Sequence, residues 1–142
     1  MTVAAVVEQD DRFLVVEEMA EGHRVFNQPA GHLEPDESLL QAVIREVLEE
    51  TRGHFRPQNL VGLYRWCNPA TLETHMRVTF CGTLNGSDPE RPLDDPIIEP
   101  HWLSYDDLRA LDGELRSPLV LSCIDDYLRG CRYPLELLRD LG

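Results

Sequence analysis

Three glutamates near the middle of the chain, Glu46, Glu49 and Glu50, have the spacing of neighbours on one face of an α-helix. Like charges at this spacing cost about 0.2–0.5 kcal/mol per pair, and the last two glutamates also lie near the negative end of the helix dipole. A divalent cation would offset this cost, and carboxylate oxygens suit Mg²⁺ or Mn²⁺. The alternative is a solvated acidic face, which is common in acidic proteins.

The helix that must carry these glutamates is predicted over residues 38–51. Ser38 and Gln41 form a capping-box pattern, although Asp36 could serve as the cap instead. Gly53 is predicted to end the helix. Six apolar residues recur at helical spacing and are expected to form the buried face: Leu39, Leu40, Val43, Ile44, Val47 and Leu48.

The glutamates belong to a longer pattern. It reads Gly31, five residues, Glu37, seven residues, and then Arg45-Glu46-Val47-Leu48-Glu49-Glu50. This segment resembles the Nudix box, G-x5-E-x7-R-E-U-x-E-E-x-G-U with U aliphatic. Arg52 stands where the box has its glycine, so we expect Gly53, one residue later, to adopt the left-handed conformation that follows the helix.

The resemblance extends beyond the box. Segments 13–18, 27–34, 115–120 and 132–136 look like a bacterial phosphatase group of the Nudix family. The resemblance implies an α/β fold, namely the Nudix α/β/α sandwich with a mixed central sheet. It also implies a single domain over residues 1–142. It also implies Mg²⁺- or Mn²⁺-dependent hydrolysis of nucleoside di- and triphosphates, and of thiamine-pathway pyrophosphates such as hydroxymethylpyrimidine pyrophosphate and thiamine pyrophosphate, with release of orthophosphate.

The resemblance also implies residue roles. Glu46, Glu49 and Glu50 would bind the metal, with the Gly31 carbonyl as a further oxygen ligand. Arg45 is the arginine of this catalytic motif and is expected to pair with Glu37, orienting the loop and the helix. Glu46 is the favoured general base, and Glu99, from a later segment, is the alternative.

Substrate-binding residues are predicted from type and position. Arg24 and Arg77 lie on predicted strands, where a guanidinium can grip phosphate bidentately, but a solvated arginine would look the same. Trp66 or Tyr64 could stack on a purine or pyrimidine ring, or could simply pack in the core or at a sheet edge.

Strands and helices are predicted around this central helix. Residues 3–7 and 13–16 read as a hairpin, and 24–26, 60–66, 74–84 and 97–103 as further strands. Residues 27–31 read as a loop because they contain Pro and Gly. Ser104 is expected to cap a short helix, and Ser117-Pro118 to open a helix that runs to about Arg129.

Composition narrows the function. The net charge is −13, and all 13 basic residues are arginines, which argues against binding to nucleic acids or anionic membranes. The absence of lysine excludes Schiff-base and Walker-A chemistry. No apolar run is long enough to span a membrane, no secretory signal appears, and the four cysteines form no C-x-x-C motif, so a reducing cytoplasm is expected.

The expected partner is a small phosphate ester bound through a cation, on a monomer or a homodimer. Two other functions stay open. One is a pyrophosphohydrolase that removes oxidised dNTPs from the nucleotide pool by releasing pyrophosphate. The other is a Nudix domain that senses a ligand without turnover. The complete set of box carboxylates favours an enzyme over a sensor.

Overall fold

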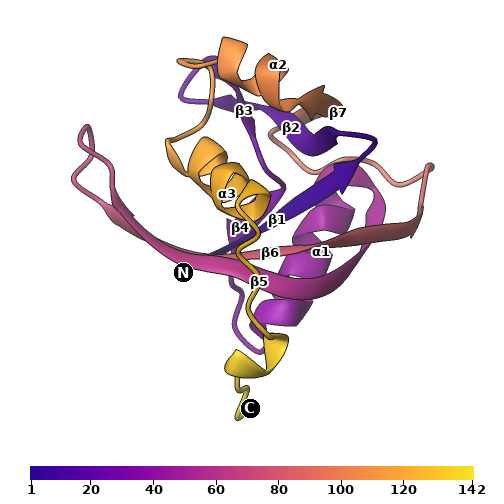
Figure 1. The fold of residues 1–142 in the computed structure, drawn as a ribbon. Helices are drawn as coiled ribbons and strands as arrows, with labels where there is room; N and C mark the ends of the chain where they lie inside the picture. The colour runs from indigo at the N-terminus through magenta and orange to yellow at the C-terminus, as the bar shows by residue number, and fades with distance from the viewer.

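The computed structural model describes residues 1–142 and places a mixed sheet between helices on two sides (Figure 1). Its strands are β1 (Thr2–Gln9), β2 (Arg12–Ala20), β3 (His23–Asn27), β4 (Ala30–His32), β5 (Gly53–Cys67), β6 (Thr74–Ser87) and β7 (Ile97–Ser104). Its helices are α1 (Leu39–Thr51), α2 (Tyr105–Ala110), α3 (Leu119–Leu128) and the 3-10 turn η1 (Leu135–Leu137). The predicted α/β sandwich with a mixed central sheet is confirmed.

The strand order is β3-β2-β1-β6-β5, with β4 on β1 and β7 on β2. β1 and β6 are parallel, whereas the other pairs are antiparallel. The β1–β2 hairpin is confirmed, and its turn residues Asp10 and Asp11 both have positive φ, as a tight hairpin turn requires. Beyond this turn the two strands separate, so that β1 joins β4 and β6 while β2 joins β3 and β7.

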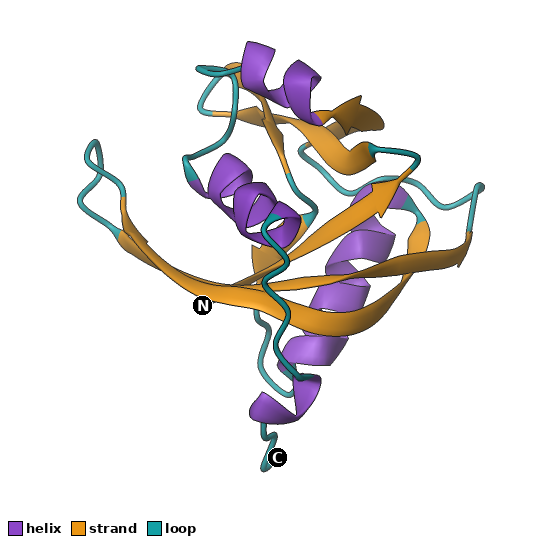
Figure 2. Cartoon of the chain, in the orientation of Figure 1, coloured by secondary structure: helices purple, strands orange, loops and turns teal.

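Two apolar cores lie on opposite faces of the sheet, with α1 on one side and α3 on the other (Figure 2). The alternation of β1 divides them, because Val3, Ala5 and Val7 face α1 while Val6 faces α3. Cys123 and Ile124 of α3 complete the second core.

The buried side of α1 differs from the predicted one. Val43 and Val47 are fully buried as expected, but Ile44 is 38% exposed while Ala42 and Glu50 are buried. The reason is that α1 also contacts β4 and the segment before β7, which cover its glutamate side. The predicted apolar face is therefore confirmed at Leu39, Leu40, Val43 and Val47, but it does not include Ile44, and the buried surface of α1 extends to Ala42 and Glu50.

Two local predictions are also wrong. Ala30 and Gly31, the end of the predicted loop 27–31, belong to strand β4 (Ala30–His32), which pairs with β1 from Thr2 to Ala4. Gly53 does not take the left-handed conformation; Arg52 does, with φ of 69°. Gly53 instead begins β5, where a Cβ atom would lie 2.9 Å from Leu84 Cδ2. A close approach, and not a left-handed turn, is what this glycine provides.

The end of the chain crosses the outer edge of the sheet. Tyr133 exchanges two backbone hydrogen bonds of 2.8 Å with Leu60 of β5. Leu135 and Leu138 then pack against the α1-side core. No helix in the structure combines the length and the apolar character needed to cross a bilayer.

Candidate active site

The box helix begins where the sequence predicted. The Ser38 hydroxyl accepts a hydrogen bond from the Gln41 amide at 3.1 Å, and the Gln41 side chain accepts one from the Ser38 amide at 2.8 Å. This capping box satisfies two amides that a helix start leaves unpaired. It also fixes the start of the helix whose last two turns carry Glu46, Glu49 and Glu50.

Strand β4 meets this helix through backbone atoms. The Ala30 amide donates a 2.9 Å hydrogen bond to Glu50 Oε1. A Cβ atom on Gly31 would lie 2.1 Å from the Glu46 carboxyl carbon, so any side chain at this position would displace the Glu46 carboxylate. Pairing of β4 with β1 therefore brings Gly31 and the glutamates together.

Arg45 holds the loop before α1 against the glutamates. Its Nε and Nη2 bind both carboxylate oxygens of Glu37, at 3.0 and 2.6 Å, which confirms the predicted ion pair. Its Nη1 donates to Glu46 at 2.8 Å and to Glu49 at 3.0 Å. These contacts, first those with Glu37, raise the pKa of Arg45, and the Arg45 contact lowers the pKa of Glu37.

Glu50 has no such partner. It is 9% exposed, it accepts the Ala30 amide, and no arginine or histidine lies within ion-pair distance of it. Burial raises its pKa to about 9. Burial is also the main cause that raises the pKa values of Glu46 and Glu49. The protein alone thus leaves the cluster short of positive charge.

The donor set fits a hard divalent cation. The Glu46 carboxyl fills the space that a side chain on Gly31 would take, Glu50 accepts the neighbouring Ala30 amide, and Glu46 and Glu49 share Arg45 Nη1. A buried carboxylate without a counter-charge is costly unless a cation or a proton neutralises it. This arrangement can therefore hold a cation beside the backbone of β4.

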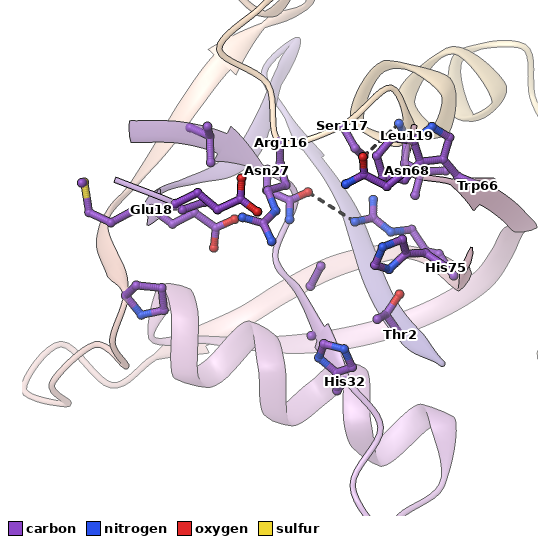
Figure 3. A pocket seen from close by; sticks show the side chains of 18 of the residues that line it. Thr2, Glu18, Asn27, His32, Trp66, Asn68, His75, Arg116, Ser117 and Leu119 are labelled. Atoms are coloured by element: carbon purple, nitrogen blue, oxygen red, sulfur yellow. Dashed lines mark hydrogen bonds between the residues drawn. The ribbon is translucent and has the colours of Figure 1, made fainter. Parts of the chain in front are cut away.

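A cavity of about 580 Å³ borders the carboxylates through Ala30 and Gly31 (Figure 3). Arg77 and Trp66, both predicted for substrate binding, line it. Trp66 stacks on His75 with ring centroids 5.7 Å apart and planes at 26°. Tyr64 lies outside the lining and donates a hydrogen bond to Asp126 at 2.7 Å.

Arg24 and Glu99 lie elsewhere. Arg24 has a 66% exposed side chain and pairs with Glu17 at 2.9 Å. Glu99 stands opposite Glu17 across the β2–β7 pair, beside His101. Glu17 itself lines a second cavity, away from the one that Glu18 lines. The structure therefore does not bring these two predicted residues together with the glutamates of α1.

Two carboxylates near the site had not been singled out from the sequence. Glu18 lines the cavity, and its negative charge contributes to the raised pKa of Glu50. Asp94 hydrogen-bonds to Glu49, and its backbone amide donates to the Glu49 carbonyl at 3.2 Å. The only sequence signal for either is a pair of adjacent acidic residues at the end of a strand or in a loop.

Comparison of the sequence with known proteins identifies the family of this chain. The NUDIX domain model matches residues 1–121. Phosphatase NudJ of Escherichia coli K12 is 41% identical over 142 residues, which cover all of this chain and 92% of that protein.

Solved structures agree. A NUDIX hydrolase from Nitrosomonas europaea superposes with a TM-score of 0.96 at 50% identity, over 98% of this chain and 95% of that one. A bifunctional NMN adenylyltransferase/ADP ribose pyrophosphatase from Francisella tularensis, complexed with AMP and a Mn ion, shares the fold at a TM-score of 0.72 and 20% identity, over 92% of this chain and 41% of that one. The chain belongs to the Nudix family and is a hydrolase that acts on phosphoanhydride bonds.

Proposed function

We propose that this hydrolase is a Mg²⁺-dependent phosphatase, also active with Mn²⁺. Its substrates would be nucleoside di- and triphosphates and thiamine-pathway pyrophosphates, including hydroxymethylpyrimidine pyrophosphate and thiamine pyrophosphate, and it would release orthophosphate. The observation that carries the proposal is the buried, unpaired Glu50 beside Glu46 and Gly31, next to a cavity that contains an arginine and an aromatic pair. The 41% identity to a phosphatase supports the choice of reaction.

In this proposal the carboxylates have two roles, metal binding and general-base catalysis. Glu46, Glu49 and Glu50, with the Gly31 carbonyl, hold the cation, which when bound neutralises phosphate charge and makes water more acidic. Arg45 keeps Glu46 and Glu49 in place by its hydrogen bonds. Glu46 is the proposed general base. The later segment contributes Asp94 next to Glu49, whereas Glu99 lies by Glu17.

The cavity receives the rest of the substrate. The Trp66–His75 stack offers a flat surface to a purine or pyrimidine ring. Stacking discriminates weakly between bases, so we expect several nucleotides to be accepted. Arg24 has no substrate contact in this proposal because it pairs with Glu17 outside this cavity.

We also propose that residues 1–142 act as one domain on dissolved small molecules in the cytoplasm. All four cysteines are free, as is usual in a reducing compartment.

Hydrolysis assays test the proposal. GTP, hydroxymethylpyrimidine pyrophosphate and thiamine pyrophosphate would be incubated with Mg²⁺ or Mn²⁺ and the products resolved by phosphorus NMR. We expect orthophosphate, and a loss of at least about 100-fold in rate for Glu50→Gln, since even residues that only orient metal ligands contribute 10–100-fold. Glu136→Gln, an exposed carboxylate change in η1, should leave the rate unchanged.

Other products would contradict the proposal. Pyrophosphate and GMP as the sole products from GTP would identify a pyrophosphohydrolase of the nucleotide pool. Binding without turnover under every metal condition would identify a sensor.

A further inference from the structure

Arg77 is a buried charge without a counter-ion. It lies on β6 between β1 and β5, opposite Thr2 and Tyr64, and is 6% exposed. It takes part in no ion pair within 4.0 Å, and its Nε atom has no hydrogen-bond partner. An arginine in such a place ordinarily pairs with a carboxylate, because desolvating a lone guanidinium is costly.

The groups that hold Arg77 are neutral. Its Nη1 donates to Gln28 Oε1 at 3.0 Å and its Nη2 to Asn27 Oδ1 at 3.4 Å, the contact that the dashed line from Asn27 marks in Figure 3. Gln28 is itself fixed, since it is 1% exposed and donates to the Val120 carbonyl at 2.6 Å. The guanidinium is thus oriented by neutral amides, and Glu18, which lines the same cavity, acts on its charge only from beyond ion-pair distance.

Arg77 lines the cavity directly, whereas the glutamates of α1 lie on the other side of the sheet, behind Ala30 and Gly31 of the cavity wall. Gly31 pairs with Val3, whose side chain faces α1, and the Glu46 carboxylate fills the space where a Gly31 side chain would lie. Arg77 pairs with Thr2, and the residue two positions along β6, Thr79, contacts Cys123 of α3. A cation on the glutamates and an anion on Arg77 would therefore occupy separate places, joined through the cavity that both Gly31 and Arg77 line.

We infer that Arg77 binds the phosphate that the substrate keeps, the one next to the phosphorus that water attacks. This inference rests on the proposed phosphatase function and names a second subsite within it. Bidentate contact with a phosphate supplies the directly contacting anion that Arg77 lacks in the folded chain. Arg116, exposed at the rim of the same cavity, adds positive charge there.

Binding without metal isolates this subsite. In EDTA no cation can bridge a phosphate to the glutamates, so affinity for a phosphate must come from the protein. Uridine monophosphate and uridine would be titrated into the full chain by calorimetry, the nucleoside serving as the probe without phosphate. The monophosphate should bind more tightly than uridine, and Arg77→Gln should lower its affinity by about tenfold or more while leaving uridine binding unchanged.

Two variants complete the test. Arg65→Gln removes the same charge from β5 outside the cavity lining and should bind both probes like the wild type. Arg77→Lys keeps the charge without the planar fork and should bind the monophosphate with intermediate affinity, which also serves if Arg77→Gln fails to fold.

The inference is overturned if Arg77→Gln or Arg77→Lys binds the monophosphate as tightly as the wild type. It is also overturned if uridine and monophosphate affinities fall equally, because Arg77 would then only support the cavity wall. Mg²⁺-dependent hydrolysis, measured on the same preparations, reports separately on the phosphatase function. If Glu50→Gln loses hydrolysis but binds the monophosphate normally without metal, the result supports the catalytic role of Glu50. It then shows that the phosphate subsite at Arg77 does not depend on that role.

Discussion

At the scale of single residues, Glu50 is a buried carboxylate with no cationic side chain in ion-pair contact. It is buried, receives one amide hydrogen bond, and has a pKa near 9 without metal. Its folded pKa lies above its unfolded value of 4.5, so the folded chain holds a proton that the unfolded chain has released. In this window, from about pH 4.5 to 9, the contribution of Glu50 to stability falls as pH rises.

We therefore expect the free energy of unfolding in EDTA to decrease from pH 5 to pH 8, with Glu50 contributing up to about 1.4 kcal/mol per pH unit. Glu50→Gln removes this titration, so its curve should be flatter and should lie above the wild type at pH 8. Urea denaturation at each pH measures this, with Glu136→Gln as the control that should follow the wild type. Parallel curves for the wild type and Glu50→Gln would show that Glu50 is not protonated in the folded chain.

At the scale of elements, the C-terminal end of α1 differs from the Nudix box, because Arg52 stands where the box has glycine. Arg52 holds the left-handed conformation, where a side chain costs about 1 kcal/mol relative to glycine. Its Nε donates to the Arg91 carbonyl at 2.6 Å, and its own carbonyl accepts from Asp88 at 2.8 Å. The side chain thus attaches the helix exit to the loop that also carries Asp94.

Replacement of Arg52 by glycine and by alanine separates these effects. Both variants lose the hydrogen bond to Arg91, but only glycine relieves the backbone. Arg52→Gly should therefore be more stable than Arg52→Ala by about 1 kcal/mol in urea denaturation, with both retaining their hydrolysis rates. An alanine variant at least as stable as the glycine variant would rule out the left-handed exit.

The sequence predicted those elements whose signal is local. The apolar spacing and capping box of residues 38–51 determine α1, and the fixed spacing from Gly31 to Glu50 identifies the glutamate cluster. β4 carries no such signal, because three residues next to a proline become a strand only by pairing with β1. Asp94 was missed for the same reason, since tertiary contacts alone bring its loop to Glu49.

At the scale of the whole molecule, the last ten residues cover part of the free edge of β5, the outermost strand. Tyr133 pairs with Leu60, and Leu135 and Leu138 cover part of the α1-side core. A chain that ends at Arg132 should lose about 2–4 kcal/mol of stability, from two hydrogen bonds and two partly buried leucines. It should also self-associate more, because an uncovered β-edge can pair with another chain.

Urea denaturation and size-exclusion chromatography at several concentrations measure both effects. A chain that ends at Arg139 removes only exposed residues and serves as the control. Equal stability of the two shortened chains would show that the Tyr133–Leu138 segment contributes no net stability to the sheet.

The alternation of β4 has a consequence for how this enzyme can be altered. The Cβ direction of Gly31 points to the helix that carries the glutamates, while the neighbouring Ala30 and His32 point to the other side of β4, so the proposed metal site and the proposed substrate cavity lie on opposite sides of one short strand. A mutant library confined to cavity residues such as His32, Trp66 and His75 would leave the glutamates of the proposed metal site unchanged. Such a library gives protein engineering a route to new selectivity that keeps the existing hydrolytic chemistry.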